Sequence, residues 1–323
     1  CDGEAVHVAG IMQHIEEAGV HSGDSACSLP PHTLSLDVQN RIVEQTEALA
    51  KALHVVGLMN VQFAVKNDEI YLIEVNPRAS RTVPFVAKAT DSAIASIAAR
   101  LMAGEKLTAF PPAPPHQDVD EDTVIPLSDP MTLSDFRTPW YSVKEAVLPF
   151  ARFPGVDTLL GPEMRSTGEV MGWDRTFARA FLKAQLGAGT SLPDTGTVFL
   201  SIKEADKTEE LVDTANMLKT LGFHILATGG TAAYLAQHGI ETETVNKQYE
   251  GGRTIVDIMK DGHVHLVMNT TEGAQAVEDS RSMRSVTLMD KIPYFTTLAG
   301  SHAAALAMVS AREGETVVRA LQG

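Results

Sequence analysis

The first third of the chain mixes helical and strand-like spacing of its apolar residues. Apolar positions three and four residues apart predict an amphipathic helix, while short apolar runs on either side of a polar stretch at 66–69 predict two strands. The expected elements are strands at 1–12, 58–65 and 70–75 and helices at 36–54 and 84–104. We also expect a turn at Asp2-Gly3 within the first strand, and Gly104 just beyond the last helical turn.

The stretch 110–139 breaks this pattern. It holds seven prolines and six acidic residues against one arginine. Such a composition buries too little apolar surface to offset the entropy lost on ordering. We therefore expect a flexible insertion without a chemical role.

Downstream of this insertion the pattern changes from strand-like patches at 140–172 and a helix at 176–186 to a regular alternation. A linker rich in Gly, Ser and Pro covers 187–196. Apolar strands then alternate with helices, which indicates a parallel sheet covered on both faces. The expected elements are strands at 198–202, 224–228, 242–246 and 265–269 and helices at 206–221 and 231–238. The prediction is an α/β protein, with an α+β domain on an antiparallel sheet at 1–190 and a Rossmann-like parallel α/β domain at 191–323.

Composition narrows the classes of function. Apolar residues make up 44% of the 323 positions, which is typical of a globular protein, and the net charge of −15 argues against nucleic-acid binding. Two cysteines fit a reducing compartment, so we expect a cytoplasmic protein without disulfides. No apolar run approaches the roughly 20 residues of a membrane span. Because the first residue is Cys1 and not methionine, we expect a piece of a longer protein.

Polar residues interrupt two neighbouring apolar strands in the first domain. Alternation places Glu74 and Asn76 on one face of their strand, and Gln62 is the single polar residue inside the strand 61–65. In a hairpin, Gln62 faces Glu74 only with a three-residue loop or a bulge, because a two-residue turn would put them on opposite faces. Three oxygen donors on one face suit Mg²⁺. For Glu74 alone, a capped strand end with ordinary salt bridges is the alternative.

A second polar constellation gathers where the predicted parallel strands end. The string Thr228-Gly-Gly-Thr231 leads from a strand into a helix, whose N-terminal amides can hold an anion. Two lysines, hydroxyl groups and an amide at the same sheet edge fit a nucleoside monophosphate, although a simple turn and helix cap would explain the Thr-Gly-Gly-Thr string alone. The residues of this predicted effector site are Ser201, Lys207, Thr228, Thr231, Lys247, Asn269 and Thr271.

Several long strings occur in one order and resemble a known family. They are HIEEAGVHSGDSACSLP from His14, VQFAV from Val61, IEVNPRASRTVPFV from Ile73, YSVKE from Tyr141 and LGPEMRSTGEVMG from Leu160. Together they are similar to the C-terminal half of an ATP-grasp ligase, and most similar to the second synthetase unit of the carbamoyl-phosphate synthase large subunit. The part from 197 onward resembles the domain shared by methylglyoxal synthase and the regulatory end of that family.

The resemblance implies roles for particular residues in a site for ATP and Mg²⁺ or Mn²⁺. Gln62, Glu74 and Asn76 would be metal ligands, with Gln62 and Glu74 also near the nucleotide. Arg78 and Arg81 would lie near the phosphates and the carbamate. The loop that contacts the nucleotide would consist of Gly19, Val20, His21 and Ser22.

The resemblance also implies control sites and partners. UMP and IMP would bind the strand-end cluster, and an ornithine and K⁺ region would include Glu16, Asp24, Ser25, Glu145, Tyr294 and Thr296, although solvated surface acids are the alternative for each carboxylate taken alone. Phe295 stands where some relatives carry Asp, and Gly229 where some carry His. The full protein would pair with a glutaminase small subunit and form oligomers of heterodimers.

The implied reaction is the ATP-dependent phosphorylation of carbamate, for arginine and pyrimidine biosynthesis. Three alternatives remain. A biotin carboxylase would lack the Thr-Gly-Gly-Thr domain, and a methylglyoxal synthase would need catalytic carboxylates that the sequence does not place. An effector-binding module without catalysis is the alternative from another class, and we expect this chain alone to be inactive as a synthetase.

Overall fold

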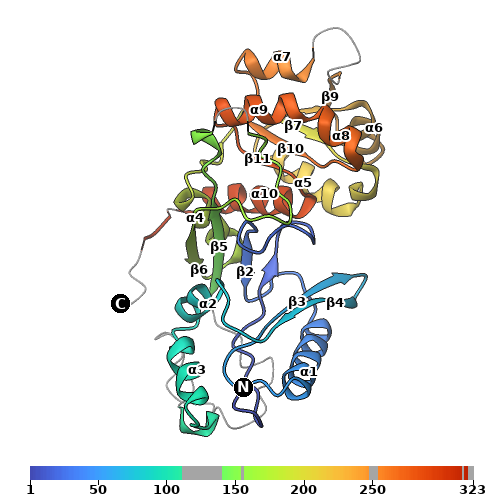
Figure 1. The fold of residues 1–323 in the computed structure, drawn as a ribbon. Coiled ribbons are helices and arrows are strands. Elements are labelled where there is room, and N and C mark those ends of the chain that lie inside the picture. Colours follow the sequence, from blue (N-terminus) through green and yellow to red (C-terminus); the bar gives the residue numbers. More distant parts are fainter. Residues whose placement is uncertain (111–139, 154–155, 247–253, 315, 319–323) are drawn as a thin grey trace. The chain divides into compact units, whose positions relative to one another are not determined.

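The computed structural model describes residues 1–110, 140–153, 156–246, 254–314 and 316–318. The chain divides into two compact units (Figure 1): Cys1–Gln13 with Cys27–Ser142 belong to the first, and His14–Ala26 with Val143–Val318 to the second. Of the predicted insertion only Phe110 is described, and it is buried. Among the described helices, none is long and apolar enough to cross a membrane.

The first unit contains the predicted amphipathic helix as α1, Leu36–Ala52. The hydroxyl of Ser35 accepts a hydrogen bond from the Val38 amide at 3.3 Å and caps the first turn. The apolar stripe buries Val38, Ile42 and Ala50, as the spacing predicts. The prediction of this helix is confirmed.

The predicted strand pair is an antiparallel hairpin of β3, Asn60–Lys66, and β4, Glu69–Asn76. Its turn consists of Asn67 and Asp68, with φ of 52° and 61°. Two positive φ values in a two-residue loop match the twist of the flanking strands, and Asn and Asp tolerate this conformation better than other side chains.

Two expectations for the first unit are wrong. The turn at Asp2-Gly3 forms as predicted, since Gly3 adopts φ 92° and the Asp2 carboxylate accepts hydrogen bonds from the amides of Glu4 and Ala5, but no strand covers 1–12. The first strands are instead β1, Gln13–His14, and β2, Cys27–Leu29.

The helix expected at 84–104 is broken into α2, Val83–Ala89, and α3, Ile94–Met102. The Thr90 hydroxyl donates to the Val86 carbonyl oxygen, and Asp91 then takes a left-handed φ of 47°, which no helix continues through. Gly104 does lie just beyond the last turn, with φ 101°, before the short helix η1, Leu107–Ala109.

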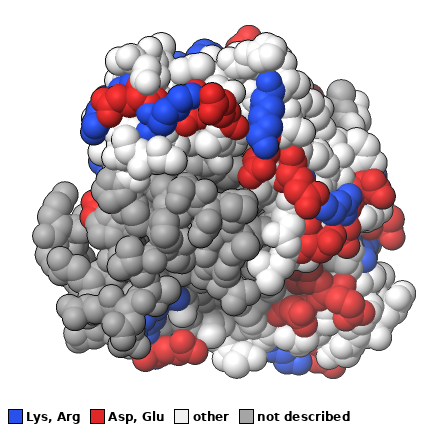
Figure 2. Space-filling model, turned by 90° about the horizontal axis from the view of Figure 1, so that it is seen from below, with Lys and Arg blue, Asp and Glu red and all other residues white. Residues whose placement is uncertain are grey.

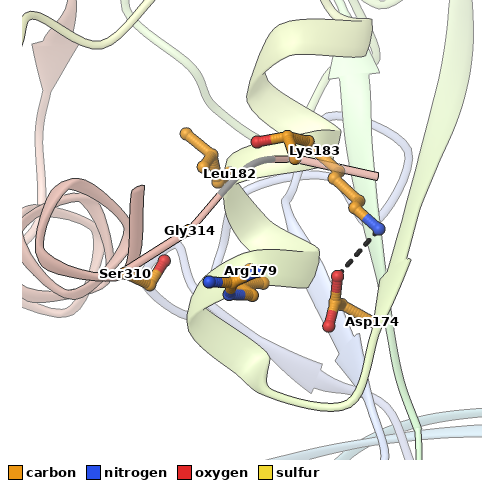
Figure 3. A pocket seen from close by; sticks show the side chains of 7 residues that line it. Asp174, Arg179, Leu182, Lys183, Ser310 and Gly314 are labelled. Atoms are coloured by element: carbon orange, nitrogen blue, oxygen red, sulfur yellow. Dashed lines mark ion pairs between the residues drawn. The ribbon is translucent and has the colours of Figure 1, made fainter. Parts of the chain in front are cut away.

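The second unit contains most of β5, Tyr141–Val147, which neighbours β6, Gly168–Asp174, in a sheet. The short helix η3, Phe150–Arg152, follows β5, and α4, Phe177–Gly187, packs on β6. Contact between this helix and strand is close at Gly172, where a Cβ atom would lie 1.9 Å from the carbonyl oxygen of Ala180. Figure 3 shows Lys183 of α4 reaching back to Asp174 at the end of β6, where Nζ and Oδ2 are 2.7 Å apart.

The alternating pattern after the linker forms a five-stranded sheet in the order β11-β10-β7-β8-β9. Every neighbouring pair is parallel, which confirms the predicted sheet type. The strands are β7, Thr197–Ser201, β8, His224–Ala227, β9, Glu243–Thr244, β10, Leu266–Asn269, and β11, Tyr294–Phe295.

Helices cover both faces of this sheet. Helix α5 packs on α10 and α7 on α9, and the two pairs lie on opposite sides of the strands (Figure 1). Alternate strand residues such as Phe199, Leu226 and Val267 form a core with the side of α7 and α9. The bounds are η4, Glu204–Asp206, α5, Glu209–Thr220, α6, Gly229–Gln237, α7, Ile255–Lys260, α8, Gly273–Asp279, α9, Arg281–Met289, and α10, Leu298–Arg312.

Candidate functional site

The register of the β3–β4 hairpin brings the predicted metal ligands to one face. The turn has two residues, which alone would place Gln62 and Glu74 on opposite faces. A bulge between Gln62 and Phe63 corrects the register: Phe63 pairs with Leu72, Gln62 pairs with Glu74, and Ile73 is the extra residue. The bulge alternative of the prediction is therefore confirmed and the three-residue loop is wrong.

The polar groups of this face form a compact set of oxygen donors. The Asn76 side-chain amide donates from Nδ2 to Oε1 of Glu74 at 2.9 Å, which confirms that the two side chains share a face. This hydrogen bond engages the Asn76 nitrogen, so the Asn76 amide oxygen and the second Glu74 carboxylate oxygen remain available as ligands for a cation. Carboxylate and amide oxygens are the ligand types that Mg²⁺ takes.

The two predicted arginines follow β4 on an exposed bend. Arg78 donates from Nη1 to the neighbouring Ala79 carbonyl oxygen at 2.9 Å, which leaves most of its guanidinium open to solvent. Arg81 is exposed as well. Both side chains therefore supply positive charge at the surface of the first unit, close in sequence to the oxygen donors of the hairpin.

The predicted nucleotide-contacting loop lies in the second unit. Gly19 has φ 105°, a conformation that suits glycine, and the His21 amide donates to the Gly161 carbonyl oxygen at 2.8 Å. The His21 ring accepts a hydrogen bond at Nδ1 from the Gly23 amide at 3.0 Å. This bond fixes the tautomer, so the neutral ring carries its proton on Nε2 and presents a donor there. The adjacent Val20 and Ser22 are part of the same turn.

Glu16 and Glu145 form a carboxyl pair with unusual acidity. Burial raises the pKa of Glu16 to about 8, with repulsion from Glu145 adding to the effect, and burial raises the pKa of Glu145 to about 7. Gln185 donates to Oε2 of Glu145 at 2.6 Å, whereas Oε2 of Glu16 is buried without a hydrogen-bond partner. A cationic ligand would satisfy this oxygen and lower both pKa values.

Asp24 has a structural role in this conformation. Its side chain is 1% exposed, and its two oxygens accept hydrogen bonds from the backbone amides of Arg165 and Ser166, both at 2.8 Å. Ser25 is also buried and its hydroxyl donates to the His21 carbonyl oxygen at 3.4 Å. Both groups are therefore engaged within the protein.

Part of the predicted effector site borders a cavity of about 370 Å³ at the ends of β7, β8 and β9. Lys207, Thr228 and Thr231 line it, together with the N-terminal glycines of α6. The Lys207 ammonium lies 3.2 Å from the position that a Cβ atom of Gly230 would take, so the charge points at the helix N-terminus. Open amides, a positive helix end and a lysine make this cavity suited to a phosphate group.

Three further effector-site predictions, Ser201, Asn269 and Thr271, do not line this cavity. Ser201 is buried at the end of β7. Asn269 ends β10 and donates from Nδ2 to the Tyr294 hydroxyl at 2.8 Å and to the Ser280 hydroxyl at 3.2 Å. Thr271 follows this strand and is half-buried. Lys247 lies outside the described residues.

The predicted ornithine residues of the parallel sheet are Tyr294 and Thr296. The Tyr294 hydroxyl accepts a hydrogen bond from Asn269, a predicted effector-site residue, and burial raises the pKa of Tyr294. Phe295 and Thr296 follow, and the Thr297 hydroxyl caps α10 and donates to the Ile15 carbonyl oxygen at 3.3 Å. The start of α10 is thus tied to the residue that precedes Glu16.

Two surface regions of the described part of the chain provide no further candidate site. The hollow of Figure 3, between α4 and the end of α10, is too tight to admit a water molecule. On the face in Figure 2, the coloured Lys and Arg side chains alternate with Asp and Glu instead of forming one basic surface. No group of three or more His, Cys, Asp or Glu residues suited to a metal occurs among the residues described.

Three buried or half-buried charges were not predicted. Lys144 is fully buried, and its ammonium donates to the carbonyl oxygens of Ser22 and Ser25 at 3.1 and 2.6 Å. Lys203 lines the effector cavity, and Arg284 is buried on α9. The only sequence signal for Lys144 and Arg284 is a charge placed at an otherwise apolar position, since their partners lie far away along the chain.

Comparison with known proteins agrees with this geometry. Residues 2–110 match the model of the carbamoyl-phosphate synthase L chain ATP binding domain, and residues 210–296 match the MGS-like domain. The carbamoyl phosphate synthase large chain of Brucella suis is 54% identical over 100% of this chain and 26% of its own length. Those of Rhizobium meliloti and Pasteurella multocida are 53% and 54% identical over 100% and 94% of this chain, and 26% and 27% of their own lengths.

The chain thus spans about a quarter of the length of these relatives. A solved biotin carboxylase domain of a single-chain bacterial carboxylase covers 57% of this chain and 44% of its own, at a TM-score of 0.41 and 18% identity, which is too distant to support an inference. An ATP-binding part followed by an MGS-like part, at more than half identity throughout, places the chain in the family of the carbamoyl phosphate synthase large chain.

Proposed function

We propose that this chain is part of the large subunit of a glutamine-dependent carbamoyl-phosphate synthase. In that protein it supplies metal ligands for the ATP-dependent phosphorylation of carbamate and a regulatory site for nucleotides. The observation that carries the proposal is the bulged hairpin, which pairs Gln62 with Glu74 and places Asn76 beside it. The product would serve arginine and pyrimidine biosynthesis.

The hairpin residues would hold Mg²⁺ or Mn²⁺ between the phosphates of ATP. Glu74 supplies the negative charge, and Gln62 and Asn76 supply neutral amide oxygens. A bound metal offsets the charge that develops during phosphoryl transfer, so the chain needs no protein nucleophile. Arg78 and Arg81 would bind phosphoryl and carbamate oxygens, for which their planar donors are suited. The loop Gly19 to Ser22 would contact the nucleotide.

The cavity at the start of α6 would bind UMP and IMP as effectors. Lys207 and the amides of Gly229 and Gly230 meet the phosphate, because the lysine and the helix end converge on one spot. Thr228 and Thr231 shape the wall: the Thr231 hydroxyl accepts the Ile202 amide at 3.0 Å and so joins the helix to β7. Ser201, Lys247, Asn269 and Thr271 belong to the same proposal.

Glu16 and Glu145 would bind a cationic ligand, either the ammonium of ornithine or K⁺. The buried and unpartnered Oε2 of Glu16 supports this assignment. Asp24 and Ser25 would support the loop around this ligand, in keeping with their hydrogen bonds inside the protein. Tyr294 and Thr296 would close the site from the side of α10, where Phe295 replaces a possible acidic contact.

The remaining parts of the proposal follow from the resemblance to the family. A glutaminase small subunit would supply ammonia to the full protein, which would assemble as an oligomer of heterodimers in the cytoplasm. This chain by itself would make no carbamoyl phosphate, since it spans about a quarter of the relatives' length. Formation of carbamoyl phosphate from bicarbonate, ammonia and MgATP by the 323-residue chain would contradict that statement.

Calorimetric titration with UMP and IMP tests the effector site. Lys207→Met removes the ammonium that faces the helix end, and we expect the Kd to rise about tenfold or more, as for the loss of a charge-assisted hydrogen bond. Lys219→Met is the matched control, because Lys219 is an exposed lysine at the end of α5, outside the cavity. Equal affinity of the Lys207 variant and the wild type would refute the assignment.

A further inference from the structure

An ion pair between a buried arginine and a half-buried aspartate joins α9 to a segment outside the parallel sheet. The Arg284 side chain is 2% exposed, and its Nε and Nη2 donate to the two carboxylate oxygens of Asp157, both at 2.6 Å. This bidentate contact lowers the pKa of Asp157, chiefly through the hydrogen bond to Arg284. The partners are 127 residues apart in sequence, so the contact fixes tertiary and not local structure.

On one side the pair continues into the effector site. Arg284 also interacts electrostatically with Tyr294, whose hydroxyl accepts a hydrogen bond from the Asn269 side-chain amide at 2.8 Å. Asn269 ends β10, where the effector residues gather, and it donates to the Ser280 hydroxyl as well. Any ligand that engages the Asn269 amide must therefore compete with the hydroxyl groups that link it to Arg284.

On the other side the pair continues into the loop that precedes β6. The backbone carbonyl of Asp157 accepts a hydrogen bond from the Arg165 guanidinium at 2.9 Å, which closes the segment 157–166 on itself. The amides of Arg165 and Ser166 then donate to the buried Asp24 carboxylate. In between, the Gly161 carbonyl oxygen accepts the His21 amide at 2.8 Å. We name the segment 157–166 the strap.

The strap thus has one end on Arg284 and the other on the loop 19–24. The hydrogen bonds of Asn269 with Tyr294, of Asp157 with Arg284 and Arg165, and of Asp24 with Ser166 are 2.6–2.9 Å long. Asp24 and Arg284 are almost fully buried. Separating the pair would leave the buried Arg284 charge without a partner, which is costly. The Asp157 side chain is therefore either bound to Arg284 or released from it, without a stable intermediate arrangement. This is the kind of element through which two sites can share an equilibrium.

We propose that the strap couples the effector cavity to the nucleotide-contacting loop, with Arg284 as its positioning residue. The inference rests on the proposed function of both sites. Lys203 lines the cavity, and its backbone amide donates to the hydroxyl of Thr270, the residue after Asn269, at 2.8 Å. Binding of a nucleoside monophosphate in the cavity therefore shifts the contacts of Asn269 with Tyr294 and Arg284, and the strap carries the change to His21 and Asp24. Arg284 touches neither ligand and acts through Asp157.

Amide hydrogen exchange, resolved at single residues by NMR, tests the strap directly. The reporters are the amides of His21, Arg165 and Ser166, because each donates one of the connecting hydrogen bonds. Asp157→Asn keeps an oxygen for the Leu159 amide but removes the ion pair. We expect exchange at all three reporters to quicken about tenfold or more without any nucleotide present.

Two further variants make the result specific. If Asp157→Asn alone fails to fold, the double variant Asp157→Asn with Arg284→Met removes the unpaired charge, and the same quickening is expected. Glu105→Gln is the matched control, because Arg100 and Glu105 form a similar bidentate pair with distances of 2.8 and 2.6 Å on the exposed surface of the first unit. It should leave the three reporters unchanged.

Addition of UMP distinguishes a failure of the strap proposal from a failure of the effector-site proposal. In the wild type, UMP should change the exchange rates of the three reporters, and in the double variant UMP should still bind but leave the rates unchanged. Unchanged reporters in a folded Asp157 variant, or in wild type saturated with UMP, would refute the strap. Absence of UMP binding by calorimetry would remove the effector proposal, while the comparison without nucleotide still decides whether the strap holds the loop.

Discussion

Gly172 offers a sharp test of how β6 and α4 pack. A Cβ atom at this position would lie 1.9 Å from the Ala180 carbonyl oxygen and 2.4 Å from the Ala184 amide nitrogen, and both are backbone atoms of α4 that no side-chain rotation can move. The change Gly172→Ala therefore requires the helix and the strand to separate by about 1.5 Å to reach an ordinary contact distance.

The expected magnitude follows from this displacement. Overpacking a core usually costs about 1–3 kcal/mol, and a clash with rigid backbone belongs at or above the upper end of that range. For a folding unit of about 150–250 residues, about 3 kcal/mol corresponds to a fall in Tm of about 6–12 °C. The loss should appear as an earlier unfolding transition by calorimetry or circular dichroism.

Gly168→Ala is the control on the same strand. A Cβ atom at Gly168 would meet nothing within 4 Å, and the residue is exposed. Alanine costs less backbone entropy than glycine, so this variant should be neutral or more stable by up to about 1 kcal/mol. Equal Tm values for the two alanine variants would refute the close approach of α4 and β6.

Two further predictions concern pH and capping. The pKa of Glu16 is raised to about 8 in the folded protein, so its stabilising contribution is fully present below the ordinary carboxyl pKa and is lost as the pH rises through about 8. The Tm of the wild type should therefore fall between pH 5 and pH 8, and Glu16→Gln should make this fall smaller. An unchanged slope of Tm against pH in the variant would contradict the raised pKa of Glu16. Thr297→Val removes the hydroxyl that accepts the Gly300 amide at 2.9 Å and should destabilise the protein by about 1–2 kcal/mol in urea unfolding, whereas Thr208→Val, at a cap without a side-chain hydrogen bond, should cost much less.

Sequence patterns predicted the helices and strands whose formation depends on residues close together in the chain. The helix at α1 follows from apolar spacing and the Ser35 cap, and the parallel sheet follows from buried strands alternating with helices. The break between α2 and α3 was harder to predict from the sequence, because Asp91 takes its left-handed φ inside a stretch whose apolar spacing is otherwise helical. The range 1–12 is not a strand, although the turn at Asp2-Gly3 within it forms as predicted.

The candidate sites were predictable to the extent that their residues are close in sequence. Glu74 and Asn76 share a face by alternation alone, and Thr228 to Thr231 lie at a helix start by motif. The contacts of Asp24 and Arg284 come from residues more than 120 positions away, so no local pattern could indicate them. Sequence alone also left the turn length and the bulge of the hairpin as alternatives.

That hairpin has a consequence for how relatives of this chain are aligned. Its two-residue turn and the extra residue at Ile73 jointly set which side chains share a face, and a three-residue turn without a bulge would give the same pairing of Gln62 with Glu74. A relative built in the second way would differ by an insertion in the turn and a deletion in the strand. An alignment would show two separate gaps there, although the two changes are compensatory and leave the proposed metal-binding face intact.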